Sequence, residues 1–599
     1  MLKTLSKIFF LLPQLRQKQL IGLALAMVLV SFVELGLAGT ISLLGVALAD
    51  PASLEKIAVF KKIFQLVPNI SREMPSSVRM LLFVMGMVCI ATIAKNIITA
   101  VLTYWQNVVS QLIGSDVSSL LFEKYMYAPY FWHMQKNPGE LSDYLNWRGQ
   151  IAALFLGVLQ VVSNFGVMFI LMLGVFWVAP TVALLLYGVT ACVAILVYKF
   201  SQNNAKNAGI QFVGLSTGVS RVIHAALHGI REVQIYHRRS AFIEKYSSAL
   251  AMMARLSARQ GTYPTLPTWC LECSGMLLLF LSIIVMVFNG ENVAMITGTL
   301  TMMAAVSWRL LPAVNKIVGG ILQVKTYYPT VIKILENYSD SNVTEKESDW
   351  LKTFSLIEIA DVDFYYPDSK NAALKNLNLT IPKGCMIGVV GLSGAGKSTL
   401  VGILTGLLKP TSGKIIIDGT ETAPLPGFIK IGYVPQHPYI MDASLAENVA
   451  FADWGGVPDE GRVIKCCQLA AIDFLDELPQ GINTILGDRG VRLSGGQVQR
   501  VSVARALYNN PEILLFDEAT SALDGAAESA IQKTIMTLSN DLTIIIIAHR
   551  LSTVEECDKL FWLKDGKVHR SGPARDVLAE YEAFLAEHTC GTDCIAGKV

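Results

Sequence analysis

The stretch Gly391-Leu392-Ser393-Gly394-Ala395-Gly396-Lys397-Ser398-Thr399 decides the fold of the region around it. It follows the apolar run Met386–Val390, which predicts a buried strand, and it precedes a helical run. Its glycines let backbone N–H groups close around phosphates at a helix N-terminus, Lys397 adds a positive charge toward the β- and γ-phosphates, and Ser398 offers a hydroxyl to Mg²⁺. The stretch therefore predicts an α/β domain that binds a nucleoside triphosphate with Mg²⁺.

Two adjacent carboxylates follow the apolar strand predicted at Ile513–Phe516. At the C-terminal end of such a strand, Asp517 is placed to hold Mg²⁺ and Glu518 to polarise the attacking water. The alternative is an acidic pair on the surface without a role. The strand and the phosphate-binding stretch upstream favour the catalytic interpretation.

Further motifs identify the class of nucleotidase. The chain contains Leu493-Ser494-Gly495-Gly496-Gln497, with Gln436 upstream, Ser521-Ala522-Leu523-Asp524 after the acidic pair, and His549 after the predicted strand Ile544–Ile547. In this order, residues 355–580 resemble the ATPase domain of ABC transporters. One departure is Asp488, in Gly487-Asp488-Arg489-Gly490, where many exporters of the family carry Glu.

The resemblance implies roles for these residues and a partner. Two such domains meet head to tail, with each ATP between the glycine-rich stretch of one and the Ser494–Gln497 signature of the other. The implied ATP-binding residues are Tyr366, which stacks on adenine, Gly391, Ser393, Gly394, Gly396, Lys397, Ser398, Thr399, Ser494, Gly495, Gly496, Gln497 and Asp524. The implied catalytic residues are Glu518, His549 and Gln436, and the implied Mg²⁺ ligands are Ser398, Gln436 and Asp517. Because all motifs are intact, we expect a homodimer with two competent sites.

The rest of the chain has a different composition. Only 16% of the 599 residues are charged and 52% are hydrophobic, which predicts extensive contact with lipid. A net charge of +2 without basic tracts argues against nucleic acid, and ten scattered cysteines do not form a disulfide framework. Six apolar segments are long enough to cross a bilayer, at about 21–49, 77–106, 151–178, 180–200, 264–289 and 292–323.

These segments predict the domain order. We expect a transmembrane domain of six helices at 1–325, a polar linker at 326–354 and the nucleotide-binding domain at 355–599. With the resemblance to ABC transporters, they imply a multi-domain fold class, an all-α transmembrane bundle of the type IV ABC exporter kind followed by an α/β ATPase. The segments 107–150 and 201–263 are long, polar and helical in pattern, and positive charge in the second predicts a cytoplasmic location. Their tips are expected around residues 127–130 and 224–229.

Ionisable residues inside the apolar segments are the main clue to a cargo, because each costs roughly 3 kcal/mol at the centre of the bilayer on insertion scales. They are Glu34, Lys95, Glu272, Arg309 and Lys316. At a rise of about 1.5 Å per residue, Lys95, Glu272 and Arg309 lie at similar depth. Either the acids and bases pair with each other, or the three bases form a cationic chamber for an anionic cargo.

A second, looser resemblance is to the PglK-type flippases of lipid-linked oligosaccharides. It rests on Ser31–Glu34, Lys95, Pro267–Glu272 and Trp308–Lys316, and on an amphipathic outer loop at 50–76 that either lies on the outer leaflet or covers the end of the bundle. Thr268 stands where those flippases tend to carry a base. The resemblance implies transport of a polyprenyl-diphosphate oligosaccharide across a plasma membrane, with a bacterial inner membrane as the expected location. The alternatives are a peptide, lipid or multidrug exporter, or an ATP-gated channel or regulator.

Overall fold

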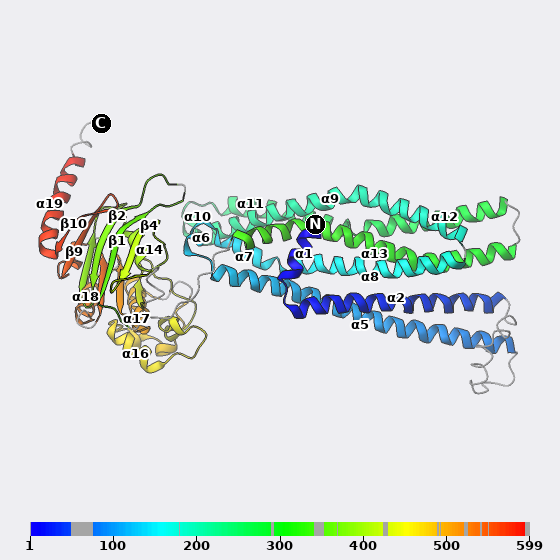
Figure 1. Cartoon of the computed structure of the whole chain (residues 1–599), viewed down its shortest axis with the longest axis horizontal. Coiled ribbons are helices and arrows are strands. Elements are labelled where there is room, and N and C mark those ends of the chain that lie inside the picture. Colours follow the sequence, from blue (N-terminus) through cyan, green and yellow to red (C-terminus); the bar gives the residue numbers. More distant parts are fainter. Residues whose placement is uncertain are drawn as a thin grey trace. The chain divides into compact units, whose positions relative to one another are not determined.

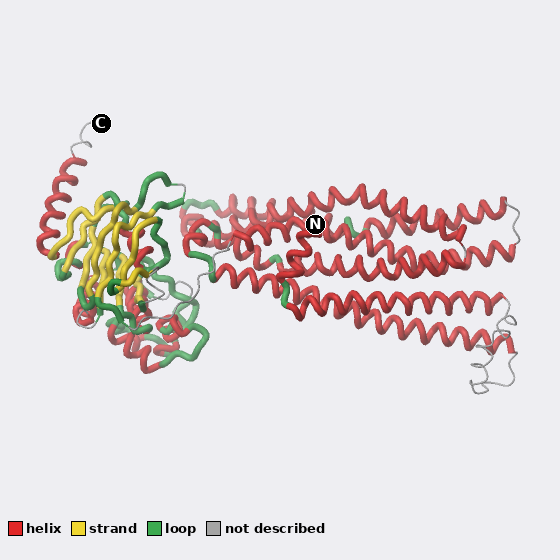
Figure 2. Tube along the Cα trace, viewed as in Figure 1, coloured by secondary structure: helices red, strands yellow, loops and turns green. Residues whose placement is uncertain are grey.

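The computed structural model describes residues 2–49, 76–178, 180–288, 293–340, 353–367, 369–422, 429–487, 490, 493–519, 525–538, 542–548 and 550–593. The chain divides into two compact units, Met1–Thr344 and Glu345–Val599. The first unit is helical and the second contains sheets and helices (Figure 2). Each unit is described below by itself.

Long helices pack side by side in the first unit (Figure 1). The described helices are α1 (Leu2–Leu11), α2 (Gln14–Ala49), α5 (Ser76–Met126), α6 (Tyr130–Gln135), α7 (Pro138–Asn146), α8 (Arg148–Val178), α9 (Pro180–His228), α10 (Ile230–Ile235), α11 (Arg239–Thr262), α12 (Leu266–Phe288) and α13 (Val293–Asp340). Helix α13 packs against α8, α9 and α12, while α2 packs against α5 and α8.

The described residues of each apolar segment fall in one of six long helices, α2, α5, α8, α9, α12 and α13, apart from residues 264 and 265, which precede α12. Within the described part of the chain, three helical stretches are long and apolar enough to cross a membrane, Gln14–Leu37, Leu82–Met126 and Pro138–Leu173. The count of six spans therefore stays a prediction. The two expected tips coincide with the ends of α5 and α9, where the chain turns into the short helices α6 and α10.

The expected linker at 326–354 needs a correction. Residues 326–340 continue helix α13, and residues 341–352 lie outside the described part. Val331 and Ile334 are buried in the same apolar cluster as Tyr125 of α5, so their spacing of three fixes one face of α13 against the bundle. The polar composition of the following residues concealed this helical periodicity.

Two glycine contacts let α13 approach its neighbours closely. A Cβ atom added to Gly320 would lie 2.8 Å from the carbonyl oxygen of Gly157 in α8. A Cβ atom added to Gly209 of α9 would lie 2.1 Å from the carbonyl oxygen of Thr326. Both positions exclude larger residues, because the obstacle is backbone and cannot rotate away.

The Gly209→Ala variant tests this packing. Its added methyl group should push α9 from α13 and destabilise the first unit by about 1–3 kcal/mol, as overpacking of a close contact does. Gly214→Ala is the matched control, because it lies five residues further along the same helix and its added Cβ would have no atom within 4 Å. Thermal unfolding of the purified protein measures both variants, and equal midpoints for the two would contradict the packing argument.

Two sheets form the framework of the second unit. In the described residues, an antiparallel sheet has the order β2-β1-β4-β5 and a second sheet has the order β10-β9-β3-β8-β7-β6. The strands are β1 (Leu356–Phe364), β2 (Leu374–Pro382), β3 (Met386–Val390), β4 (Ser412–Ile417), β5 (Thr420–Thr422), β6 (Ile431–Val434), β7 (Ile513–Asp517), β8 (Thr543–Ile547), β9 (Lys559–Lys564) and β10 (Lys567–Pro573). Strands β6, β7, β8, β3 and β9 pair in parallel, so their carboxyl ends meet at one edge, where ligands bind in open α/β sheets.

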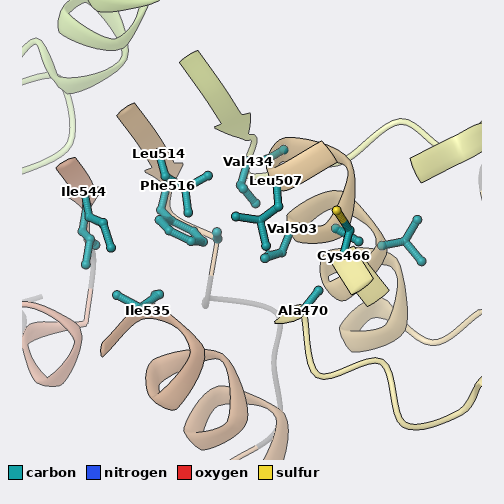
Figure 3. Packing of buried hydrophobic residues seen from close by; sticks show 14 of the residues in the cluster. Val434, Cys466, Ala470, Val503, Leu507, Leu514, Phe516, Ile535 and Ile544 are labelled. Atoms are coloured by element: carbon teal, nitrogen blue, oxygen red, sulfur yellow. The ribbon is translucent and has the colours of Figure 1, made fainter. Parts of the chain in front are cut away.

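Helices cover the parallel sheet. They are α14 (Lys397–Leu404), α15 (Leu445–Val449), α16 (Glu460–Leu469), α17 (Gly495–Tyr508), α18 (Gly525–Leu538) and α19 (Ala574–Asp593). Figure 3 shows Leu514 and Phe516 of β7 facing Val503 and Leu507 of α17, with Ile535 of α18 nearby. These two residues of β7 and two residues of α17 are each at most 6% exposed, so burial of their apolar side chains holds α17 on the sheet.

Candidate functional site

The glycine-rich stretch forms the turn between β3 and α14. Gly396 caps α14 with a φ of 103°, a left-handed conformation that residues with a Cβ rarely adopt. Lys397 is 6% exposed, and its Nζ donates hydrogen bonds to the carbonyl oxygens of Gly391 at 2.7 Å and Leu392 at 3.4 Å. Ser393, Gly394 and Ser398 are exposed. The buried ammonium group therefore lies within a turn whose residues 393, 394 and 398 are exposed, as a cradle for phosphate requires.

The two acidic residues lie at the carboxyl end of β7. Tyr433 of the neighbouring strand β6 donates its phenolic hydrogen bond to Asp517 Oδ2 at 3.1 Å. Glu518 has a φ of 51°, and its backbone N–H bonds to the carbonyl oxygen of Ile547 in β8 at 2.9 Å. Gln436 Nε2 donates to Glu518 Oε2 at 2.7 Å. Asp517, Glu518 and Gln436 therefore meet at one end of the sheet.

Electrostatics link this pair to the phosphate-binding turn. Burial lowers the pKa of Lys397, while Glu518 and Asp517 act in the opposite direction. Burial raises the pKa of Asp517, and Glu518 adds to this rise, while the hydrogen bond from Tyr433 and the charge of Lys397 oppose it. The raised pKa marks a carboxylate that is held in the site at the cost of solvation.

The oxygen donors fit Mg²⁺. This ion is bound through one or two carboxylates together with phosphate oxygens and water, rather than in an all-protein cage. Asp517 supplies the carboxylate and Ser398, at the start of α14, supplies a hydroxyl. No cluster of three or more His, Cys, Asp or Glu side chains suited to a metal occurs among the described residues.

Tyr366 lies against the first turn of α14. The Tyr366 hydroxyl lies 3.1 Å from Thr399 Oγ1 of α14, and the Tyr366 ring contacts Phe364 edge to face.

The signature residues begin helix α17. Ser494 caps this helix, since its hydroxyl accepts a hydrogen bond from Gln497 N at 3.3 Å and Gln497 Oε1 accepts one from Ser494 N at 2.9 Å. Gly495 and Gly496 form the first turn of α17. The signature is thus a helix N-terminus, which suits an anion.

Some predicted positions lie outside the described residues. They are Asp524, His549, Asp488, the side chain of Arg309 and most of the outer loop, residues 50–75.

A cavity of about 1290 Å³ opens within the first unit. Its lining includes Glu34, Lys95, Glu272 and Lys316, which come from α2, α5, α12 and α13. The structure thus brings together four of the five predicted intramembrane charges. Lys95 Nζ lies 2.6 Å from Glu34 Oε1, and the two residues are 7% and 8% exposed. Glu272 and Lys316 are exposed toward the cavity and have no ion-pair partner in the described part of the chain.

Sequence reasoning missed two sets of residues. Tyr433 was missed because only strand pairing places β6 beside β7. The polar lining of the cavity was also missed, namely Thr99, Thr103, Gln106, Gln160, Ser163 and Asn164. Their spacing of three or four within apolar segments was the signal that could have found them.

Comparisons with known proteins agree with this geometry. The family described as ABC transporter transmembrane region matches residues 40–310, and the family described as ABC transporter matches residues 374–521. The alpha-hemolysin translocation ATP-binding protein HlyB of Proteus vulgaris is 41% identical over 232 residues, 38% of this chain and 32% of HlyB. The ABC transporter B family member 1 of Dictyostelium discoideum is 31% identical over 447 residues, 72% of this chain and 47% of that protein.

A solved structure has the same fold. A bacterial Atm1-family ABC exporter with ATP bound superposes with a TM-score of 0.73 at 22% identity, over 95% of this chain and 99% of that chain. The chain therefore has the type IV exporter fold, a helical transmembrane domain followed by an α/β nucleotide-binding domain. The alignments to the two curated relatives span about a third to a half of those proteins' own lengths.

Proposed function

This chain belongs to the ABC transporters and joins a transmembrane domain to an ATPase domain in one polypeptide, and we propose that it uses ATP hydrolysis to export or flip an amphipathic, anionic, lipid-linked substrate. The observation that carries the proposal is the meeting of Lys397, Asp517, Glu518 and Gln436 in one unit of a chain whose other unit encloses a charged cavity. We favour a polyprenyl-diphosphate oligosaccharide as the cargo and a bacterial inner membrane as the location.

The geometry supports a division of roles at the nucleotide. The turn at 391–399 cradles the phosphates and Lys397 neutralises them. Asp517 with Ser398 would hold Mg²⁺, which when bound would supply positive charge toward the transferred phosphoryl group. Glu518 positions and polarises the attacking water, and its bond to Gln436 keeps the carboxylate oriented. Tyr366 stacks on the base, His549 contacts the γ-phosphate, and Asp524 completes the site.

A second copy of the chain supplies the rest of the site. The Ser494–Gln497 helix N-terminus carries a partial positive charge that suits the γ-phosphate of ATP bound to a partner. The exposed position of Ser494 and Gly495 fits this role. We therefore propose a homodimer, and an obligate second ABC subunit in purified material would contradict it.

The cavity supports an amphipathic cargo. One part of its lining is apolar, with Met276, Leu277, Trp308 and Leu311, and another part is charged. Glu34 and Lys95 neutralise each other, so Lys316 and Arg309 are the cations we assign to an anionic headgroup. A peptide or multidrug exporter would use the same apolar wall, and the response to added compounds separates these possibilities.

The first prediction for cargo concerns Lys316 and Arg309. Polyprenyl-diphosphate oligosaccharide should stimulate the ATPase activity of the wild-type protein in nanodiscs. The double variant Lys316→Gln, Arg309→Gln should need at least about tenfold more of this lipid for half-maximal stimulation, because the variant loses charge-assisted hydrogen bonds to phosphate. Lys333→Gln on the same helix α13 is the control, since its partner is the nearby exposed Glu336. Stimulation by peptides or drugs, but not by this lipid, would move the assignment to a general exporter.

A second prediction concerns the Mg²⁺ site. Because burial raises the pKa of Asp517, this carboxylate takes up a proton at a higher pH than an ordinary aspartate does. Protons then compete with Mg²⁺, so the Mg²⁺ concentration for half-maximal ATPase activity should rise as the pH falls, and it should begin to rise at a higher pH than for an ordinary aspartate. Asp517→Asn should bind Mg²⁺·ATP weakly at every pH, and a wild-type Mg²⁺ requirement that does not change with pH would contradict this role.

A further inference from the structure

One wall of the cavity in the first unit consists of uncharged polar side chains. Thr99, Thr103 and Gln106 follow one another on α5 at spacings of four and three, and so share a face that continues from Lys95. Gln160, Ser163 and Asn164 of α8 line the same cavity, and α8 packs against α5. We call these six residues the polar strip.

The polar strip is rich in hydrogen-bond acceptors. The hydroxyl of Thr99 donates to the carbonyl oxygen of Lys95 at 2.9 Å, and that of Thr103 donates to the carbonyl oxygen of Thr99 at 2.8 Å. Asn164 Nδ2 donates to the carbonyl oxygen of Gln160 at 2.8 Å. The two threonine hydroxyls use their only proton in these bonds and offer oxygen lone pairs to a ligand. The Asn164 amide keeps its oxygen acceptor and one N–H donor.

Acceptors of this kind favour a ligand that carries many O–H donors. A phosphate group has oxygen acceptors and negative charge, and it is matched by Arg or Lys rather than by hydroxyl lone pairs. The charge at the end of the strip is also compensated, because Lys95 is paired with Glu34 at 2.6 Å. The strip is thus neutral, whereas Lys316 provides a separate cationic position in the same cavity.

We infer that the polar strip is a subsite for an uncharged, polyhydroxylated headgroup such as a sugar, distinct from the position that takes the phosphate of the cargo. The inference rests on the proposed function, since it divides the cargo of the same cavity into a sugar part and an anionic part. The apolar wall with Met276, Leu277, Trp308 and Leu311 is left for the hydrocarbon tail.

Two probes with the same tail separate the subsites. Radiolabelled farnesyl β-glucoside carries hydroxyls without charge, and farnesyl monophosphate carries charge without a sugar. Equilibrium binding to the full chain in nanodiscs is measured for the wild type and for the double variant Thr99→Val, Thr103→Val, which removes two acceptor oxygens and preserves side-chain shape. The double variant should bind the glucoside about tenfold more weakly, as expected for two lost hydrogen bonds, and the monophosphate within about twofold of wild type.

Matched variants exclude a general effect on the helix. Thr92→Val removes the same type of hydroxyl from α5, where Thr92 donates to the carbonyl oxygen of Val88 at 2.7 Å and does not line the cavity. It should leave binding of both probes unchanged, and Thr103→Ser should keep glucoside binding close to wild type because the hydroxyl remains.

The outcomes distinguish failure of the sugar subsite from failure of the proposed cargo. Unchanged glucoside affinity in the double variant, or an equal loss for both probes, overturns the sugar subsite. Wild-type binding of the monophosphate without binding of the glucoside overturns the subsite and leaves the proposed transport of an anionic lipid standing. Absence of binding of both probes, together with no ATPase response to polyprenyl-diphosphate oligosaccharide, overturns the subsite and the proposed cargo.

Discussion

The Glu518→Gln variant is expected to hydrolyse ATP at least about a hundred times more slowly than the wild type, because general-base catalysis contributes about 10²–10⁴-fold. The substitution keeps the size of the side chain and its contact with Gln436, which lies 2.7 Å from Glu518 Oε2. It removes the negative charge that polarises water. Binding of ATP should persist, because the glycine-rich turn and Lys397 are unchanged. Phosphate release and binding of a fluorescent ATP analogue measure the two properties separately.

Glu512→Gln is the matched control for this variant. Glu512 directly precedes the same strand β7, at the end opposite to Glu518, and pairs with Lys383 at 3.0 Å near the surface. Such exposed pairs contribute about 0–1 kcal/mol, so its ATPase rate should stay within about twofold of wild type. A Glu518→Gln protein that hydrolyses ATP at the wild-type rate would remove Glu518 from the mechanism and assign the base to another group.

Local patterns in the sequence predict most of the nucleotide site. The turn at 391–399 carries its geometry in its own residues, since Gly396 adopts a φ of 103° at the start of a helix. The carboxylates at 517 and 518 follow a strand that is apolar throughout, and this places them at the ligand-binding edge of a parallel sheet. The contact of Tyr433 with Asp517 could not be predicted from the sequence, because the two residues are 84 positions apart and their contact depends on the pairing of β6 with β7.

The helical unit was harder to predict in detail. Hydropathy identifies six apolar segments, yet it gives no partner for a buried charge, and the pairing of Lys95 with Glu34 follows only from the packing of α5 against α2. Polar residues near the end of α13 suggested a linker, although Val331 and Ile334 hold that helix in the bundle. Composition averages over both faces of a helix, and for this reason it predicted neither the polar strip nor the helical end of α13.

The Lys95→Met variant should destabilise the first unit by about 3–5 kcal/mol, the typical cost of removing one partner of a buried ion pair. Glu34 is 8% exposed, and its carboxylate would lose the ammonium group at 2.6 Å. The double variant Lys95→Met, Glu34→Gln removes both charges and should recover a large part of this loss. Thermal unfolding of the single and double variants in nanodiscs gives the coupling between the two residues.

A second ion pair between the same helices provides the control. Arg16 of α2 lies 2.8 Å from Asp116 of α5, and its side chain is 18% exposed, so Arg16→Met should cost less than Lys95→Met. Equal losses of stability for the two substitutions would mean that burial of the Lys95 pair adds nothing to its contribution.

The Glu34→Gln variant separates stability from cargo binding, because it removes one partner of the ion pair and yet leaves Lys95 as an uncompensated cation at the cavity. If Lys95 faces the cargo, the Glu34→Gln variant should bind farnesyl monophosphate more tightly than the wild type does, and the Lys95→Met variant should not. If the pair is purely structural, binding of this probe should be weaker than in the wild type or unchanged in both variants.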